Sequence, residues 1–149
     1  MFTFIFTLIV AAATVLPSGT PSDDLCVQNE TDICALVAET ADGLTAYLEK
    51  TDISNEYFQT KIESASAEHR ILHIFSRSSR SSGDFEAFLT SSTFQTKNRF
   101  ELEYSRFNVN SACQPPLREI VEAGGKVKVT LLYKDGGVAH EGVTIRCPP

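Results

Sequence analysis

Four cysteines carry the most reactive side chains of this 149-residue chain, namely Cys26, Cys34, Cys113 and Cys147. Their spacings of 8, 79 and 34 residues match no zinc-ligand pattern of the CxxC type, so we predict no metal site from them. In an exported chain, four cysteines most simply form two disulfide bonds, for which three pairings exist. We favour Cys26–Cys34, at the start of the first expected helix, and Cys113–Cys147, which would join a loop to the last expected strand.

Histidines offer a second route to metal binding. His69 and His73 form an H-x-x-x-H pattern, which places both imidazoles on one face of a helix but about 13 Å apart on a strand. Because we favour a strand here, we interpret them as half-exposed strand residues. His140-Glu141 begins like the H-E-x-x-H zinc-protease motif, but Thr144 replaces the second histidine and a strand is expected where the motif needs a helix.

Acid–base and nucleophilic catalysis find little support in the sequence. Glu101 and Glu103 share one face of an expected strand, which is typical of a solvent-exposed strand face as well as of a carboxylate pair. The chain contains neither a G-x-S-x-G nucleophile motif nor a G-x-G-x-x-G nucleotide-binding motif. We therefore predict no catalytic residue, no cofactor and no metal.

Basic residues gather between positions 69 and 83, a stretch that contains no acidic residue. Arg70, Arg77 and Arg80 could contact an anionic partner, although a solubilising loop has the same composition. The chain as a whole has a formal charge of −6, which argues against a general nucleic-acid-binding protein. Nine acids and one base lie between residues 23 and 56, so that this segment is the acidic part of the chain.

The first residues predict export. Residues 2–16 form an apolar run of 15, shorter than the roughly 20 residues that span a bilayer, and small residues at positions 11–13 and 18–19 offer cleavage sites. We predict a signal peptide over residues 1–19, cleaved after Ala13 or near Gly19, and one disulfide-stabilised domain over residues 20–149. A short membrane anchor is the alternative, because no Lys or Arg precedes the apolar run. The mature protein would be secreted or periplasmic, with no stable membrane span.

Hydrophobic periodicity predicts the elements of that domain. A helix is expected over residues 32–50, because apolar residues recur there at helical spacing. Residues 56–77 favour two strands with a turn near residues 64–67, and a helix is the alternative. A loop (76–83), a helical turn from Asp84, a strand (99–107) and a short helix (117–123) follow. The chain is expected to end in a hairpin of residues 126–134 and 138–147, which turns at the Asp-Gly-Gly of positions 135–137.

This order predicts an α+β fold, in which one long N-terminal helix packs on a mainly antiparallel sheet of four to five strands and a β-hairpin closes the chain. The architecture resembles cystatin-like and NTF2-like folds. No glutamine begins the Q-x-V-x-G loop of cystatin inhibitors and the chain has no Trp, so protease inhibition loses its mechanism.

Two hypotheses for function follow. The first is a secreted or periplasmic non-enzymatic domain that binds a protein or a small ligand. The second is an NTF2-like enzyme or hydrophobic-ligand pocket, which needs an ionisable side chain that points inward. His73 and Tyr104 are the candidates for that pocket, because both alternate with apolar neighbours.

Overall fold

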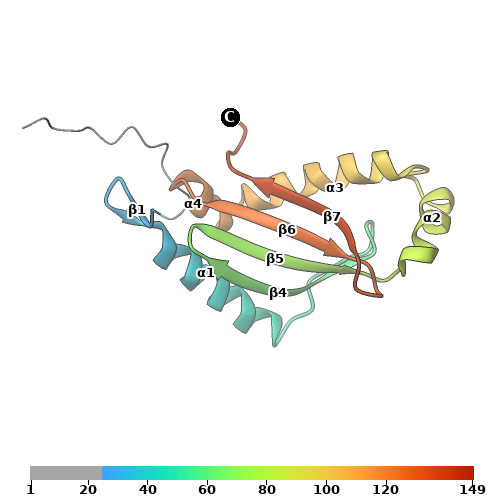
Figure 1. Cartoon of the computed structure of the whole chain (residues 1–149), viewed down its shortest axis with the longest axis horizontal. Helices are drawn as coiled ribbons and strands as arrows, with labels where there is room; N and C mark the ends of the chain where they lie inside the picture. Colours follow the sequence, from blue (N-terminus) through green and yellow to red (C-terminus); the bar gives the residue numbers. More distant parts are fainter. Residues whose placement is uncertain (1–24) are drawn as a thin grey trace, which may run out of the picture.

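The computed structural model describes residues 25–149, so the expected signal peptide lies outside the described residues. Seven strands and four helices follow one another in the described part of the chain. Their bounds, in chain order, are β1 (Val27–Gln28), β2 (Thr31–Asp32), α1 (Ile33–Leu48), β3 (Ser54–Asn55), β4 (Thr60–Glu68), β5 (Ile71–Ser78), α2 (Ser82–Ser91), α3 (Lys97–Ala112), α4 (Leu117–Glu122), β6 (Lys126–Leu132) and β7 (Val138–Thr144). The fold is α+β, as predicted (Figure 1).

A five-stranded sheet in the order β3-β4-β5-β6-β7 forms the centre of the molecule. In this sheet β5 and β6 pair in parallel, whereas the other three pairs of neighbouring strands are antiparallel. The sheet is therefore mixed, and the prediction of a mainly antiparallel sheet is wrong. Parallel neighbours need a crossover connection, and here residues 79–125 supply it with three helices.

The prediction of one long N-terminal helix is also wrong, since α1 and α3 each contain 16 residues. Helix α3 includes residues 99–107, for which a strand was expected. The alternation of Phe100, Leu102 and Tyr104 was misleading, because Leu102 is 53% exposed while Phe100 and Tyr104 are buried. The buried positions of α3 recur every fourth residue, as one face of a helix requires. Thr96 caps this helix by accepting a hydrogen bond from the Arg99 N–H at 3.3 Å.

Two strands do occupy residues 56–77, but the turn between them lies at His69 and Arg70 rather than near residues 64–67. Strand β5 also extends through residues 76–78, which were assigned to a loop. The short helix over residues 117–123 and the C-terminal hairpin of β6 and β7 are confirmed.

An aliphatic core lies beneath the half of the sheet that α1 covers. Helix α1 begins after Asp32, whose side chain accepts a hydrogen bond from the Ala35 N–H, and its face of Ile33, Val37 and Ala41 is buried. The members of this core are Ile33, Val37, Ala41, Leu72, Ile74, Ala112, Ile120, Val121, Val127 and Val129.

An aromatic core lies at the other end of the same face. Its members are Phe58, Phe85, Phe88, Leu89, Phe94, Phe100, Tyr104, Leu131 and Ala139. Phe58 stands at its centre, with the rings of Phe94 and Tyr104 at centroid distances of 5.6 and 5.1 Å. The ring of Phe94 is stacked on that of Phe58 and the ring of Tyr104 meets it edge to face, and both arrangements add attraction to the burial of apolar area.

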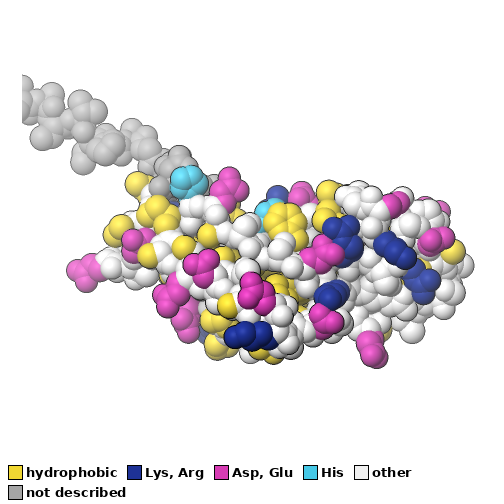
Figure 2. Space-filling model, turned by 90° about the horizontal axis from the view of Figure 1, so that it is seen from below, with side chains coloured by type: hydrophobic (Ala, Val, Ile, Leu, Met, Phe, Trp, Pro, Cys, Tyr) yellow, Lys and Arg dark blue, Asp and Glu magenta, His cyan; other side chains and the backbone are white. Residues whose placement is uncertain are grey.

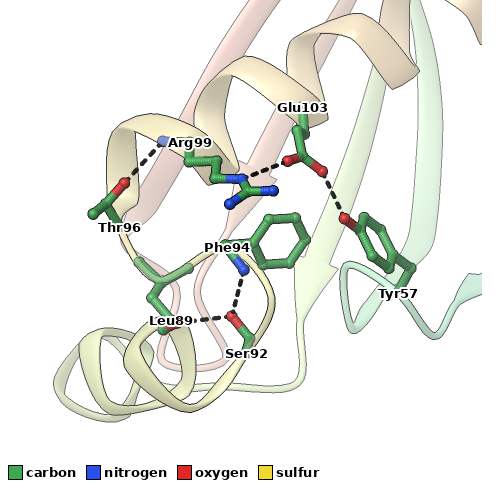
Figure 3. Close-up of polar contacts among 7 residues, drawn as sticks. All are labelled: Tyr57, Leu89, Ser92, Phe94, Thr96, Arg99 and Glu103. Carbon is green, nitrogen blue, oxygen red and sulfur yellow. Dashed lines mark hydrogen bonds and ion pairs between the residues drawn. The ribbon is translucent and has the colours of Figure 1, made fainter.

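The segments that enclose the aromatic core are joined by polar contacts at its edge (Figure 3). The Glu103 carboxylate on α3 accepts hydrogen bonds from the Tyr57 hydroxyl at 2.6 Å and from Arg99 Nε at 3.0 Å. These two bonds, in that order, lower the pKa of Glu103. Because Tyr57 lies between β3 and β4, this contact ties the β3–β4 segment to α3.

We expect the aromatic core to dominate the stability of this end of the molecule. Phe94→Ala should lower the free energy of unfolding by about 3–5 kcal/mol, because Phe94 is fully buried and its removal leaves a cavity. Leu102→Ala is the control, since an exposed residue should change it by about 0.5 kcal/mol or less. Urea unfolding measures both. Equal effects of the two variants would contradict this account of the core.

Candidate binding groove

A groove of about 650 Å³ runs between α1 and the segment that joins α3 to α4. Leu36, Gly43 and Tyr47 of α1 line one wall, and Pro115 and Leu117 line the other. Ile62 of β4 and Ile74 of β5 also line it, so that the sheet provides its floor. Most of the surface of the groove is therefore apolar.

A cavity of about 260 Å³ continues the groove beneath α3. The two spaces share five lining residues, namely Ile53, Ile62, Ile74, Ser111 and Leu117. Tyr104, Phe107 and Asn108 of α3 and Val129 of β6 line the cavity as well. The cavity lies where the aliphatic core meets the aromatic core, because Ile74 and Val129 belong to the first and Tyr104 to the second.

Small side chains leave the space between the walls of the groove unfilled. Gly43 and Thr40 face it from α1, and Ser111 faces it from α3. A Cβ atom added at Gly43 would meet no atom within 4 Å, so that open space lies directly above this position. A glycine in a helix interior lowers the stability of the helix by about 1 kcal/mol relative to alanine. At position 43 this loss accompanies the open space in the groove wall.

The deep end of the cavity is polar. The Tyr104 side chain is 1% exposed, and Thr60, Ser76 and Asn108 surround its hydroxyl. Burial raises the pKa of Tyr104, and hydrogen bonds with Ser76 and Thr60 oppose this rise. The Asn108 amide opposes it as well, from close to the Tyr104 oxygen but without the geometry of a hydrogen bond. Tyr104 is therefore a neutral hydrogen-bonding group. Asn108 is 8% exposed, and its Nδ2 atom has no hydrogen-bond partner among the described residues.

The charged residues that line the groove are both acidic, Glu39 of α1 and Glu119 of α4. Figure 2 shows acidic side chains among hydrophobic ones on the half of the molecule that carries α1, whereas most of the visible Lys and Arg side chains lie toward the other end. The groove therefore combines an apolar interior with a negative rim.

Both disulfides end on the helices that frame the groove. Cys26 is bonded to Cys34 of α1, and Cys113, at the end of α3, is bonded to Cys147. The predicted presence of disulfide bonds is confirmed, with the pairing that we favoured. Ligand atoms of Cys26, Cys34 and His69 lie within 4.8 Å of one another, but the two sulfurs are bonded to each other and offer no thiolate.

The three predicted partner-binding arginines do not form one surface. Arg70 lies at the β4–β5 turn, whereas Arg77 and Arg80 lie at the opposite end of β5. Arg70 is 8% exposed, and its Nη2 donates hydrogen bonds to Gln28 Oε1 at 2.9 Å and to the carbonyl oxygen of Gly124. It therefore holds β1 against the end of the crossover.

Arg77 and Arg80 are bound to side chains near them. Arg77 Nε pairs with Glu63 at 2.5 Å, whereas Arg80 Nε donates to Gln59 at 3.0 Å and its guanidinium lies 5.6 Å from the centre of the Phe88 ring.

The two predicted pocket residues lie on opposite faces of the sheet. Tyr104 lines the cavity, whereas His73 alternates along β5 with the buried residues Leu72 and Ile74 and so points away from the helices. His73 Nε2 lies 2.8 Å from the Thr130 hydroxyl, which donates to Glu141 at 3.0 Å.

Comparison with known proteins shows what the fold resembles. No protein-family model and no curated protein matches this chain. The type II secretion system pilotin AspS from Vibrio cholerae is 13% identical, with a TM-score of 0.54 over 76% of this chain and 88% of AspS. The type 2 secretion system pilotin EpsS from Vibrio vulnificus is 17% identical, with a TM-score of 0.55 over 78% of this chain and 93% of EpsS.

A third solved structure, of a Pseudomonas aeruginosa protein described as secreted, is 11% identical to this chain. Its TM-score is 0.55, over 85% of this chain and 95% of that protein. At these identities the likeness concerns the fold alone. The chain therefore has the α+β fold of these pilotins. Separately, no helix among its described residues is long and apolar enough to cross a membrane.

Sequence reasoning missed most of the groove. Gly43 lies in the predicted helix of residues 32–50, but nothing in a single sequence says that the space above it is open. Asn108 carries a clearer signal, since it follows Phe100 and Tyr104 at four-residue steps along the buried face of α3. A helical interpretation of residues 97–112 would have placed one amide among aromatic rings.

Arg70 and Arg80 should differ sharply when replaced. We expect Arg70→Met to lower the free energy of unfolding by about 2 kcal/mol, because it removes charged hydrogen bonds from a buried side chain. Arg80→Met should cost less than about 1 kcal/mol, since its contacts are exposed. Chemical unfolding of the two variants measures this difference. A larger loss at Arg80 would show that Arg70 is not the structural arginine.

Stability should fall as the pH falls below neutrality. Burial, more than any other interaction, lowers the pKa of His73 and of His140 from the ordinary value near 6.5. The folded protein then binds fewer protons than the unfolded chain, so this contribution is complete above about pH 7 and is lost as the pH drops through the folded pKa values. We expect the urea midpoint to decrease between about pH 7.5 and about pH 5.5. The double variant His73→Gln/His140→Gln should flatten this decrease, and an unchanged slope would contradict the assignment.

Proposed function

We propose that this chain is a non-enzymatic, extracytoplasmic binding protein of the pilotin type, which holds an apolar segment of a secretion-system component in the groove between α1 and α3. The main support for this proposal is the continuous apolar space that the groove and the cavity form together. The two helices beside it, α1 and α3, are each fixed at one end by a disulfide bond. Exposed apolar concavities of this kind are typical of sites that bind a partner.

Two further observations support this function. The fold likeness to the pilotins AspS and EpsS suggests the class of partner, a protein of a secretion apparatus. The two disulfides and the apolar run at residues 2–16 support a secreted or periplasmic location, after removal of a signal peptide at residues 1–19.

The charges of the groove narrow the chemistry of the partner. Glu39 and Glu119 lie at its rim, and in the part of the chain that the structure describes neither Lys nor Arg lines it. A bound segment that carries basic residues beside its apolar ones would pair with this rim, and its association rate would fall with added salt. An acidic segment would be repelled. The partner segment is therefore apolar with flanking Lys or Arg.

A small hydrophobic ligand is the second candidate occupant, favoured by the volume of the cavity. The NTF2-like enzyme considered from the sequence would need an ionisable group inside the cavity. Tyr104 lies there, but burial raises its pKa, and no charged side chain of the described residues 25–149 lines the cavity to act as its base.

Photo-cross-linking from inside the groove tests the proposed function. A benzophenone amino acid at position 47, where Tyr47 is 53% exposed and lines the groove, should cross-link in the native cell envelope to one apolar, basic-flanked peptide of a secretion-system protein. Tyr57 is the matched position, since it is 51% exposed and lies outside the groove. The same cross-link should be absent from position 57.

Filling the groove provides the control for this experiment. Gly43→Trp should abolish the cross-link from position 47, because the indole would occupy the open space above the helix. Gly83→Trp adds the same side chain at a helical glycine of α2 that is equally open, and should leave the cross-link intact. A cross-link that survives Gly43→Trp would refute binding in the groove.

A further inference from the structure

The deep end of the cavity contains a hydrogen-bond donor, the amide of Asn108 with its two N–H groups, that makes no hydrogen bond of normal geometry among the described residues. Asn108 projects from the buried face of α3, is 8% exposed, and lines the cavity. Its Nδ2 atom has no hydrogen-bond partner among the described residues. Leaving a buried N–H unpaired costs free energy, because water would have satisfied the same group in the unfolded chain.

The neighbours of Asn108 make this end of the cavity a polar patch on an apolar surface. Thr60, Ser76 and Tyr104 contribute hydroxyl groups from β4, β5 and α3. The surrounding surface comes from side chains such as Ile62, Ile74, Phe107 and Val129. An occupant would therefore meet hydrocarbon along most of its length and hydrogen-bonding groups at its tip.

The side chains that line the cavity determine which charge a bound group can carry. No Asp, Glu, Lys or Arg lines it among the described residues. A carboxylate placed at Asn108 would be buried without a cation, which is strongly unfavourable. A carbonyl, amide or hydroxyl oxygen would accept the hydrogen bond without that cost.

We infer that the cavity selects a neutral hydrogen-bond acceptor carried on an apolar group, with Asn108 Nδ2 as the donor that reads it. The partner segment bound in the groove supplies this group as a side chain, so the source of the group rests on the proposed function. Asn108 is thus a residue that determines specificity. An apolar cavity of about 150 Å³ accommodates a benzene ring in another protein, so that the 260 Å³ cavity here has room for a ring with a polar substituent.

Three small probes of nearly equal shape test the selection. Acetophenone carries a neutral carbonyl on a ring, α-methylstyrene replaces the oxygen by a CH₂ group, and benzoate replaces the acetyl group by a carboxylate. Titration into the oxidised, ¹⁵N-labelled protein is followed at the backbone amides of residues that line the cavity, such as Ile74 and Val129, which every variant retains. We expect acetophenone to bind about fivefold more tightly than α-methylstyrene, as one net hydrogen bond allows, and benzoate to bind most weakly.

Two variants show whether Asn108 causes the preference. Asn108→Leu keeps the volume of the side chain and removes the donor, so that acetophenone and α-methylstyrene should bind equally. Asn110→Leu makes the same change at an exposed position of the same helix, outside the cavity, and should retain the preference. Equal binding of the two probes to the unmodified protein, or no binding of acetophenone, would overturn the inference even if Asn108→Leu failed to fold.

The outcome separates this inference from the proposed function. A fivefold preference in the absence of any cross-link from position 47 would support the selective cavity and refute the protein partner as its source. A cross-link from position 47 in the absence of any probe preference would support the groove and refute the role of Asn108.

Discussion

Strands β5 and β6 lie side by side and run in the same direction, and the chain must therefore return across the sheet between them. Residues 79–125 make this return with α2, α3 and α4. Helix α3 alone spans about 24 Å at 1.5 Å per residue, about the length of the seven-residue strands β6 and β7 at 3.3 Å per residue. Because α1 covers the β4 side of the sheet face on which the helices pack, α3 lies on the β7 side of that face (Figure 1). The groove is the space that remains between the two helices.

The two cores explain why this space does not close. Each helix is anchored by its own set of buried side chains, aliphatic under α1 and aromatic under most of α3. Closing the groove would pull Phe100 and Tyr104 away from the rings of Phe58 and Phe94, with loss of close packing. The disulfide of Cys113 also holds the end of α3 to the last residues of the chain. A preformed site of this kind avoids part of the ordering entropy of binding.

The elements whose residues show one clear hydrophobic period were predicted correctly from the sequence. The prediction was wrong where the residues fit both a strand period and a helix period. Helix α1 and the β6–β7 hairpin follow from clear periodicity and from an Asp-Gly-Gly turn. Residues 97–112 satisfied a two-residue and a four-residue period together, and the ion pairs Lys97–Glu101 and Arg99–Glu103 at four-residue spacing were the evidence for a helix. The parallel pairing of β5 and β6 followed from that helix, so that one error changed the predicted sheet as well. The groove depends on distances between elements, which no single-sequence pattern contains.

The groove can bind a partner without rearrangement only if the cavity between the aliphatic and the aromatic core already exists in the free protein. A crystal structure of the oxidised protein under xenon pressure tests this most directly, because xenon enters apolar cavities that are already open. We predict a xenon atom in contact with Ile74, Phe107 and Val129, with α1 and α3 unmoved. A crystal in which Phe107 fills this space, and in which no xenon binds between the two helices, would contradict the account.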